Sequence, residues 1–162
     1  MSVQPIIQAL EKLVKLHEGL LETARQKTEI IKADSVNELQ KLLISEHKYV
    51  QALEQAEINR QKAVDAWLEA EGFNWQEPTI TAILNALTDE HMAQELENTA
   101  TKLTQTITSL KQQEELNQDL LRQSMQFVEL SLDTISPSLR QMNYGRQQPS
   151  RTSERSVFDS RI

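Results

Sequence analysis

The sequence predicts an all-α fold: an elongated antiparallel bundle of three long helices plus one short helix, followed by a flexible C-terminal tail. Two observations favour this class. The 162 residues include only 4% aromatic residues, three glycines and no cysteine, which disfavours sheet sandwiches, phosphate-binding loops and disulfide or thiolate sites. Apolar residues recur at alternating steps of three and four, as on bundled helices. We expect one helical domain, residues 1–136, and a basic tail, residues 137–162.

The first helix is predicted over about residues 3–32. Its end is placed before Ser35, because Ser35 and Glu38 have the spacing of a capping box, in which each side chain binds the other residue's backbone amide. A turn of two or three residues then makes the next helix antiparallel to the first. The expected buried row is Val3, Ile7, Leu10, Val14, His17, Leu21, Ala24, Thr28 and Ile31.

The second helix is predicted over about residues 35–71 and should end at Gly72, a residue type that closes helices well. Its apolar row contains charged residues, and Glu57 with Arg60 three positions later predicts a half-exposed ion pair. The expected row is Val36, Leu39, Leu43, Glu46, Val50, Leu53, Glu57, Arg60, Val64 and Trp67, flanked by Leu42, Tyr49, Ala56, Ala63 and Ala70.

A short helix over residues 78–87 and a long one over about 89–136 complete the predicted bundle. Pro78 suits the first turn of the short helix, and Phe73 and Trp75 are expected to close the end of the bundle. At 1.5 Å per residue, the second helix would be about 55 Å long and the last about 70 Å. The last helix should therefore extend beyond its partner by roughly three turns, where its apolar residues lie on several faces and would form an exposed binding surface.

The charge distribution disfavours nucleic acid as a partner. Residues 1–136 carry 12 Lys/Arg against 22 Asp/Glu, whereas residues 137–162 carry five Arg against two acids. An acidic body repels a phosphate backbone, and scattered arginines without interleaved aromatic residues bind it poorly. No uncharged apolar run is long enough for a signal peptide or a membrane span, so we expect a cytoplasmic protein without direct membrane insertion.

Few residues could carry catalysis or hold a cofactor. His17 lies in the expected buried row, while His47 and His91 lie on helix faces that look solvated. His91 and Glu95 could share a metal ion, but two ligands do not make a site. No phosphate-loop, dinucleotide, serine-hydrolase or zinc-protease motif occurs. We therefore predict that the chain is not an enzyme and has no catalytic residue, metal or cofactor.

The end of the last helix carries a resemblance to a known family. Asn117, Leu120 and Leu121 begin an amphipathic stretch, an apolar run over residues 125–135 follows, Pro137 breaks the helix, and Tyr144-Gly145 lies beyond it. This ending resembles the FlgN family of flagellar export chaperones, and the whole chain fits the family's outline. The resemblance implies a cytoplasmic chaperone that keeps the hook-filament junction proteins FlgK and FlgL unassembled. It would deliver them to the type III export gate protein FlhA.

The resemblance also implies two sites. Tyr144, with Gly145 beside it, would contact FlhA from the tail. The C-terminal half of the last helix would bind the cargo proteins through Asn117, Leu120, Leu121, Ser124, Phe127, Val128, Leu130, Ser131 and Ile135.

A second hypothesis uses the same surface differently. The chain could be a structural or tethering helical bundle that associates with itself through the C-terminal helix, and weak self-association is left open for a chaperone as well. This hypothesis predicts oligomers that form with rising concentration and bury Phe127.

Overall fold

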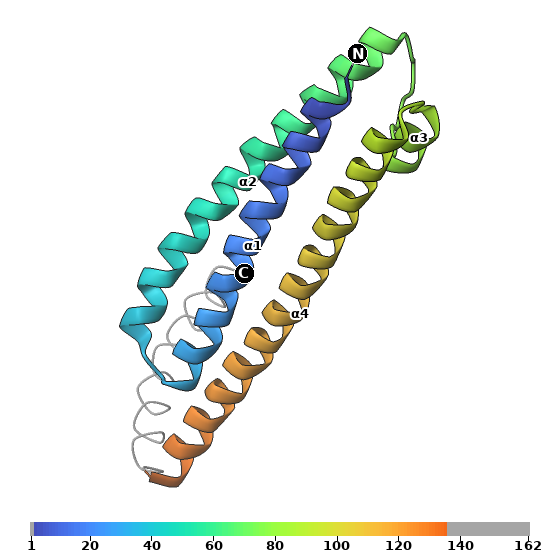
Figure 1. Cartoon of the computed structure of the whole chain (residues 1–162). Helices are drawn as coiled ribbons and strands as arrows, with labels where there is room; N and C mark the ends of the chain where they lie inside the picture. Colours follow the sequence, from blue (N-terminus) through green and yellow to red (C-terminus); the bar gives the residue numbers. More distant parts are fainter. Residues whose placement is uncertain (1, 136–162) are drawn as a thin grey trace, which may run out of the picture. The chain divides into compact units, whose positions relative to one another are not determined.

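The computed structural model describes residues 2–135, which form four helices and no strand. Figure 1 shows them as α1 (Gln4–Lys32), α2 (Val36–Glu71), α3 (Ile80–Ala86) and α4 (Glu90–Ile135). The predicted all-helical class is confirmed for this part of the chain. The predicted tail, which contains Tyr144 and Gly145, lies outside the described residues.

Two compact units divide the chain, Met1–Leu120 and Leu121–Ile162. The boundary falls inside α4, whereas the sequence analysis placed its only boundary at Pro137. The contacts between helices reported below lie within the unit Met1–Leu120.

The turn between α1 and α2 is closed by the backbone. Asp34 has a positive φ of 53°, and the Ser35 amide donates to the Ile30 carbonyl at 3.3 Å. Ser35 is the N-cap of α2 but makes no side-chain cap hydrogen bond, and Glu38 pairs with Lys41 instead. The predicted capping box is therefore wrong, because the Ser35 amide already has a partner and offers Glu38 no donor.

At two other helix ends, a single residue determines where the helix ends or begins. Gly72 ends α2 in the left-handed conformation, with φ 74°, and the Phe73 amide donates to the Leu68 carbonyl at 2.9 Å, which is the closure predicted there. Thr79 caps α3, since its hydroxyl accepts from the Ala82 amide at 3.1 Å. The short helix therefore begins at Ile80, after the Thr79 cap, and the predicted start at Pro78 was too early.

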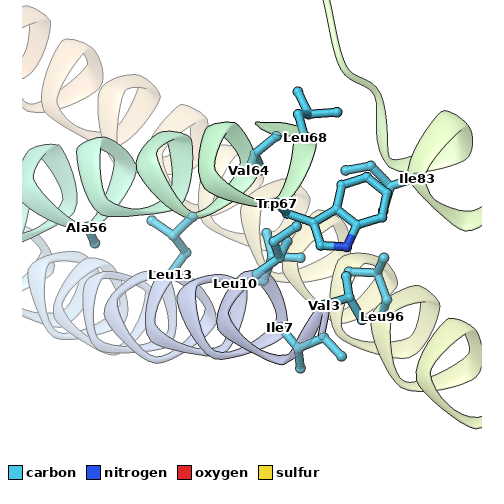
Figure 2. Close-up of a cluster of buried hydrophobic side chains, with 11 residues drawn as sticks. Val3, Ile7, Leu10, Leu13, Ala56, Val64, Trp67, Leu68, Ile83 and Leu96 are labelled. Carbon is cyan, nitrogen blue, oxygen red and sulfur yellow. The ribbon is translucent and has the colours of Figure 1, made fainter. Parts of the chain in front are cut away.

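The apolar core lies where α1, α2 and α3 meet the first turns of α4 (Figure 2). α1 buries a second row beside the predicted one, including Ile6, Leu13 and Leu20, so this helix contacts neighbours over a wide arc. Trp67 is buried, and Phe73 and Trp75 stack beside it with ring centroids 4.6 Å apart. The core residues are Val3, Ile6, Ile7, Leu10, Leu13, Ala56, Val64, Trp67, Leu68, Ile83 and Leu96.

The predicted row of α2 is wrong over its first half. Val36, Leu43 and Val50 are exposed, whereas Leu42 of the flanking row is buried. The flanking row faces α1 because its Tyr49 ring rests on Gly19, where a side chain would overlap the ring. A strict seven-residue row also drifts by about 20° per two turns on a straight helix, which adds to the difference.

Polar side chains join α1, α2 and α4 near the C-terminal end of α1. Lys27 of α1 forms ion pairs with Glu46 of α2, at 2.5 Å, and with Glu114 of α4, at 3.2 Å. Burial lowers the pKa of Lys27, but the adjacent Glu46 and Glu114 carboxylates outweigh it and raise the pKa above its ordinary 10.5. The lysine is therefore charged at neutral pH and holds two helices to α1.

Asn117 completes this polar cluster on α4. Its side chain is 1% exposed, and its amide donates to the Ala24 carbonyl of α1 at 2.8 Å. The Thr28 hydroxyl donates to the Asn117 carbonyl oxygen and accepts from the Gln113 amide at 2.6 Å. We call Lys27, Thr28, Glu46, Gln113, Glu114 and Asn117 the polar cluster.

Replacing Asn117 with alanine is expected to lower the free energy of unfolding by about 1–3 kcal/mol, because buried hydrogen-bonding groups of α1 lose their partner. Asn98 of α4 is the matched control, since it is exposed and its only described hydrogen bond is to Gln94 on the same helix. Asn98→Ala should change stability by less than about 0.5 kcal/mol. Urea unfolding of both variants measures this, and equal effects would contradict the structural role of Asn117.

Candidate functional site

The C-terminal part of α4 exposes its apolar side chains. The most exposed are Met125 and Phe127, each with 70% of its side chain accessible. An exposed apolar run of this kind is typical of an interaction surface. We call it the α4 surface and define it by the exposed apolar residues Leu121, Met125, Phe127, Val128, Leu130 and Leu132.

These residues do not lie on one stripe. Leu121, Met125, Val128 and Leu132 follow one another at steps of four and three and therefore share a face. Phe127 lies outside that stripe, and so does Leu130, so the apolar arc covers roughly 220° of the helix at 100° per residue. The expectation of apolar residues on several faces is confirmed by these exposures.

Two serines lie between the two sides of the arc. Ser124 and Ser131 are half-buried and seven residues apart, which places them on one line along the helix. Their side chains are small, so a partner helix could approach α4 more closely along this line than over the flanking leucines. Both were predicted as cargo-binding residues, and that assignment stays a prediction.

The residues at the two ends of the predicted cargo site differ from those of the α4 surface in burial or are not described. Asn117 is enclosed in the polar cluster rather than exposed, and Leu120 is half-buried at the end of the unit Met1–Leu120. We therefore leave Asn117 out of the α4 surface. Ile135 is the last residue of α4, but its side chain is not described, and Tyr144 and Gly145 lie outside the described residues.

Lys27 was not predicted as a buried residue that joins α1 to α2 and α4. A signal was present, because Lys27 continues the helical spacing of buried residues from Leu20 and Thr23 towards Ile31. Glu46 was recognised as a charged residue in the apolar row of α2, but no partner was predicted for it. A lysine in an apolar row opposite a carboxylate in another apolar row predicts such an ion pair.

No alternative chemistry emerges from the described residues. Among residues 2–135, no group of three or more His, Asp or Glu side chains is placed to hold a metal ion. His17 is half-buried, and its Nδ1 lies 2.7 Å from the Leu13 carbonyl. Within the same residues, no helix has the length and apolar character needed to cross a bilayer.

Comparisons with known proteins give the chain its family. The model of the family described as "FlgN protein" matches residues 1–151, which include the α4 surface and Tyr144-Gly145. A relative from Bacillus subtilis (strain 168), named "Uncharacterized protein YvyG", is 35% identical over 164 residues, and the match covers 99% of each chain. No solved structure matches. The family match spans most of the sequence, and the chain therefore belongs to the FlgN family.

Proposed function

We propose that this protein is a cytoplasmic flagellar export chaperone that binds the junction proteins FlgK and FlgL through the α4 surface. The family is one of flagellar export chaperones rather than enzymes. The observation that carries the proposal is the exposure of six large apolar side chains within residues 121–132. A filament protein with an unpaired amphipathic segment would otherwise polymerise, and covering that segment prevents this.

The energetics of such a surface suit a chaperone that must release its cargo. Burying apolar area on both partners contributes about 25 cal/mol per Å². Ordering a cargo segment on binding offsets several kcal/mol of that gain, which keeps the affinity moderate. An apolar arc with few polar contacts also places weak geometric demands on its partner, so one surface can accept both FlgK and FlgL.

We further propose that Tyr144 delivers the loaded chaperone to FlhA. Tyr144 stands seven residues beyond Pro137, within the range of the family match. Its ring supplies a large apolar contact with a hydroxyl at low conformational cost, so one tyrosine can carry much of a transient interaction. The neighbouring Gly145 permits backbone conformations that other residues avoid.

The same exposure also supports a second function. An apolar helix face serves equally well for self-association, so the chain could act as a tethering bundle that pairs through the α4 surface. The two functions differ in what Phe127 contacts, which is the cargo in one and a second copy in the other.

Replacing Phe127 and Leu130 together with alanine should weaken binding of FlgK and FlgL by at least about tenfold, because the variant loses apolar area at the centre of the surface. Helicity should be unchanged, since these side chains are exposed. Calorimetric titration and circular dichroism measure the two quantities. Leu43→Ala with Ile44→Ala is the matched control, because it removes two exposed apolar side chains from α2.

Three outcomes would contradict the cargo proposal. Equal losses in both double variants would show that the α4 surface is not the cargo site. Melting of the Phe127/Leu130 variant would show that these side chains belong to a core. A concentration-dependent oligomer of the wild type that this variant abolishes, without any effect on cargo affinity, would favour the tethering function.

Tyr144→Ala should keep cargo affinity within about twofold of wild type but lower binding of the chaperone–cargo complex to the cytoplasmic part of FlhA by about tenfold or more. Phe158→Ala removes another aromatic ring from the tail and is the matched control. Two separate titrations, with cargo and with the FlhA domain, distinguish loading from delivery. Equal loss of both affinities would assign Tyr144 to the cargo site, and no loss would place the FlhA contact elsewhere.

A further inference from the structure

A second apolar surface lies within the unit Met1–Leu120. A groove of about 890 Å³ opens between α2 and α4, and α1 forms its floor. Leu10 and Leu13 of α1 are buried beneath it. The walls are Val50 and Ile58 of α2 and Leu103 and Ile107 of α4. We call this the α2–α4 groove, and it shares no residue with the α4 surface.

The walls of this groove are only partly covered. Ile58 is 45% exposed and Ile107 is 41% exposed, although side chains of this type are normally buried when a core is available. A concave apolar surface with a few polar groups at its edge is the usual form of a binding site. The groove is therefore better explained by an external occupant than by imperfect packing of three helices.

Polar and charged groups lie at the edge of the groove. His17 Nδ1 lies 2.7 Å from the Leu13 carbonyl of the same helix. Arg60 binds both oxygens of Glu57 at 2.6 and 2.8 Å, so its charge is already matched. The Glu54 carboxylate is exposed at the same edge.

The charge of the unit points to a basic occupant rather than a second copy. Residues 1–120 carry 20 Asp/Glu against 11 Lys/Arg, and two such units repel each other. The four wall side chains also offer a much smaller area than the roughly 800 Å² that each partner buries in a stable dimer. Lysine or arginine side chains would instead pair with the exposed Glu54 carboxylate.

The dimensions of the groove suit a helix. Val50 and Ile58 are eight residues apart on α2, which corresponds to about 12 Å along the axis. Two turns of a partner helix span a similar length and can place apolar side chains at positions i, i+3 or i+4, and i+7 between the walls. A helix in this position would complete a four-helix arrangement over α1.

We propose that the α2–α4 groove binds an amphipathic helix of another protein, which carries lysine or arginine beside its apolar stripe. This second docking surface is independent of the cargo surface on α4. It allows the chaperone to hold a helical segment of a partner while the α4 surface is occupied.

A synthetic peptide tests this inference. The probe is a fluorescent amphipathic helix of about five turns, with leucines at helical spacing and lysines on both flanks, measured by anisotropy against the full chain. The wild type should bind it at least about tenfold more tightly than the same peptide with glutamates on its flanks. Ile58→Gln with Ile107→Gln should lose about tenfold or more, because polar amides replace both walls.

Two matched controls locate the binding. Val36→Gln changes an exposed apolar residue of α2 outside the groove and should alter the peptide affinity by less than about twofold. Phe127→Ala with Leu130→Ala should also leave it unchanged, which separates this inference from the cargo proposal. Circular dichroism and urea unfolding confirm that each variant is folded.

Several results would overturn the inference. Equal losses for Val36→Gln and the groove variant would show that the peptide is attracted only by the acidic surface. Loss of binding in the Phe127/Leu130 variant would place the peptide on the α4 surface. Equal affinity for the glutamate peptide would remove the charge argument. A wild-type dimer in sedimentation equilibrium that the groove variant abolishes would assign the groove to a second copy.

Discussion

Buried polar contacts hold α4 against α1 within the unit Met1–Leu120. Asn117 is almost fully buried and satisfies its amide with α1, while Lys27 joins α1 to carboxylates on α2 and α4. Apolar contacts alone tolerate sliding of one helix along another, but a buried amide that loses its partner costs free energy. The observed register of α4 on α1 satisfies these groups together.

The division of α4 follows from this arrangement. Leu96 lies in the core and Asn117 in the polar cluster, and the next compact unit begins at Leu121. Beyond that residue α4 continues to Ile135 as one helix, which satisfies its backbone hydrogen bonds internally. Large apolar side chains can therefore be presented on a formed helix. The acidic composition, with 24 Asp/Glu against 17 Lys/Arg, limits non-specific association of such a surface.

The sequence was most informative where one residue decides the local structure. Gly72 was predicted to end α2 and does so in the left-handed conformation. The Glu57–Arg60 pair was also predicted and is present. In both places the outcome depends on neighbours within one helical turn, and no distant part of the chain competes.

The features that could not be predicted from the sequence depend on contacts between helices. Asn117 was assigned to the cargo site from the family resemblance, and the amphipathic pattern alone does not show that Thr28 and Ala24 lie opposite it. The buried face of α2 was rotated because the pattern does not show that Tyr49 rests on Gly19. The exposure of apolar residues on α4 was easier to predict, since apolar residues on several faces of one helix exceed what a narrow seam can bury.

The absence of native cysteine allows a direct test of where cargo contacts α4, because one introduced thiol reports one position. Leu116 and Leu130 are both exposed leucines of α4, 46% and 66% accessible, and they lie before and after the end of the polar cluster. Thiol labelling rates of Leu116→Cys and Leu130→Cys should both be fast in the free protein. Bound FlgK or FlgL should slow labelling at position 130 by about tenfold or more and leave position 116 nearly unchanged. Equal protection of both positions, or of neither, would contradict a cargo surface that begins beyond Asn117.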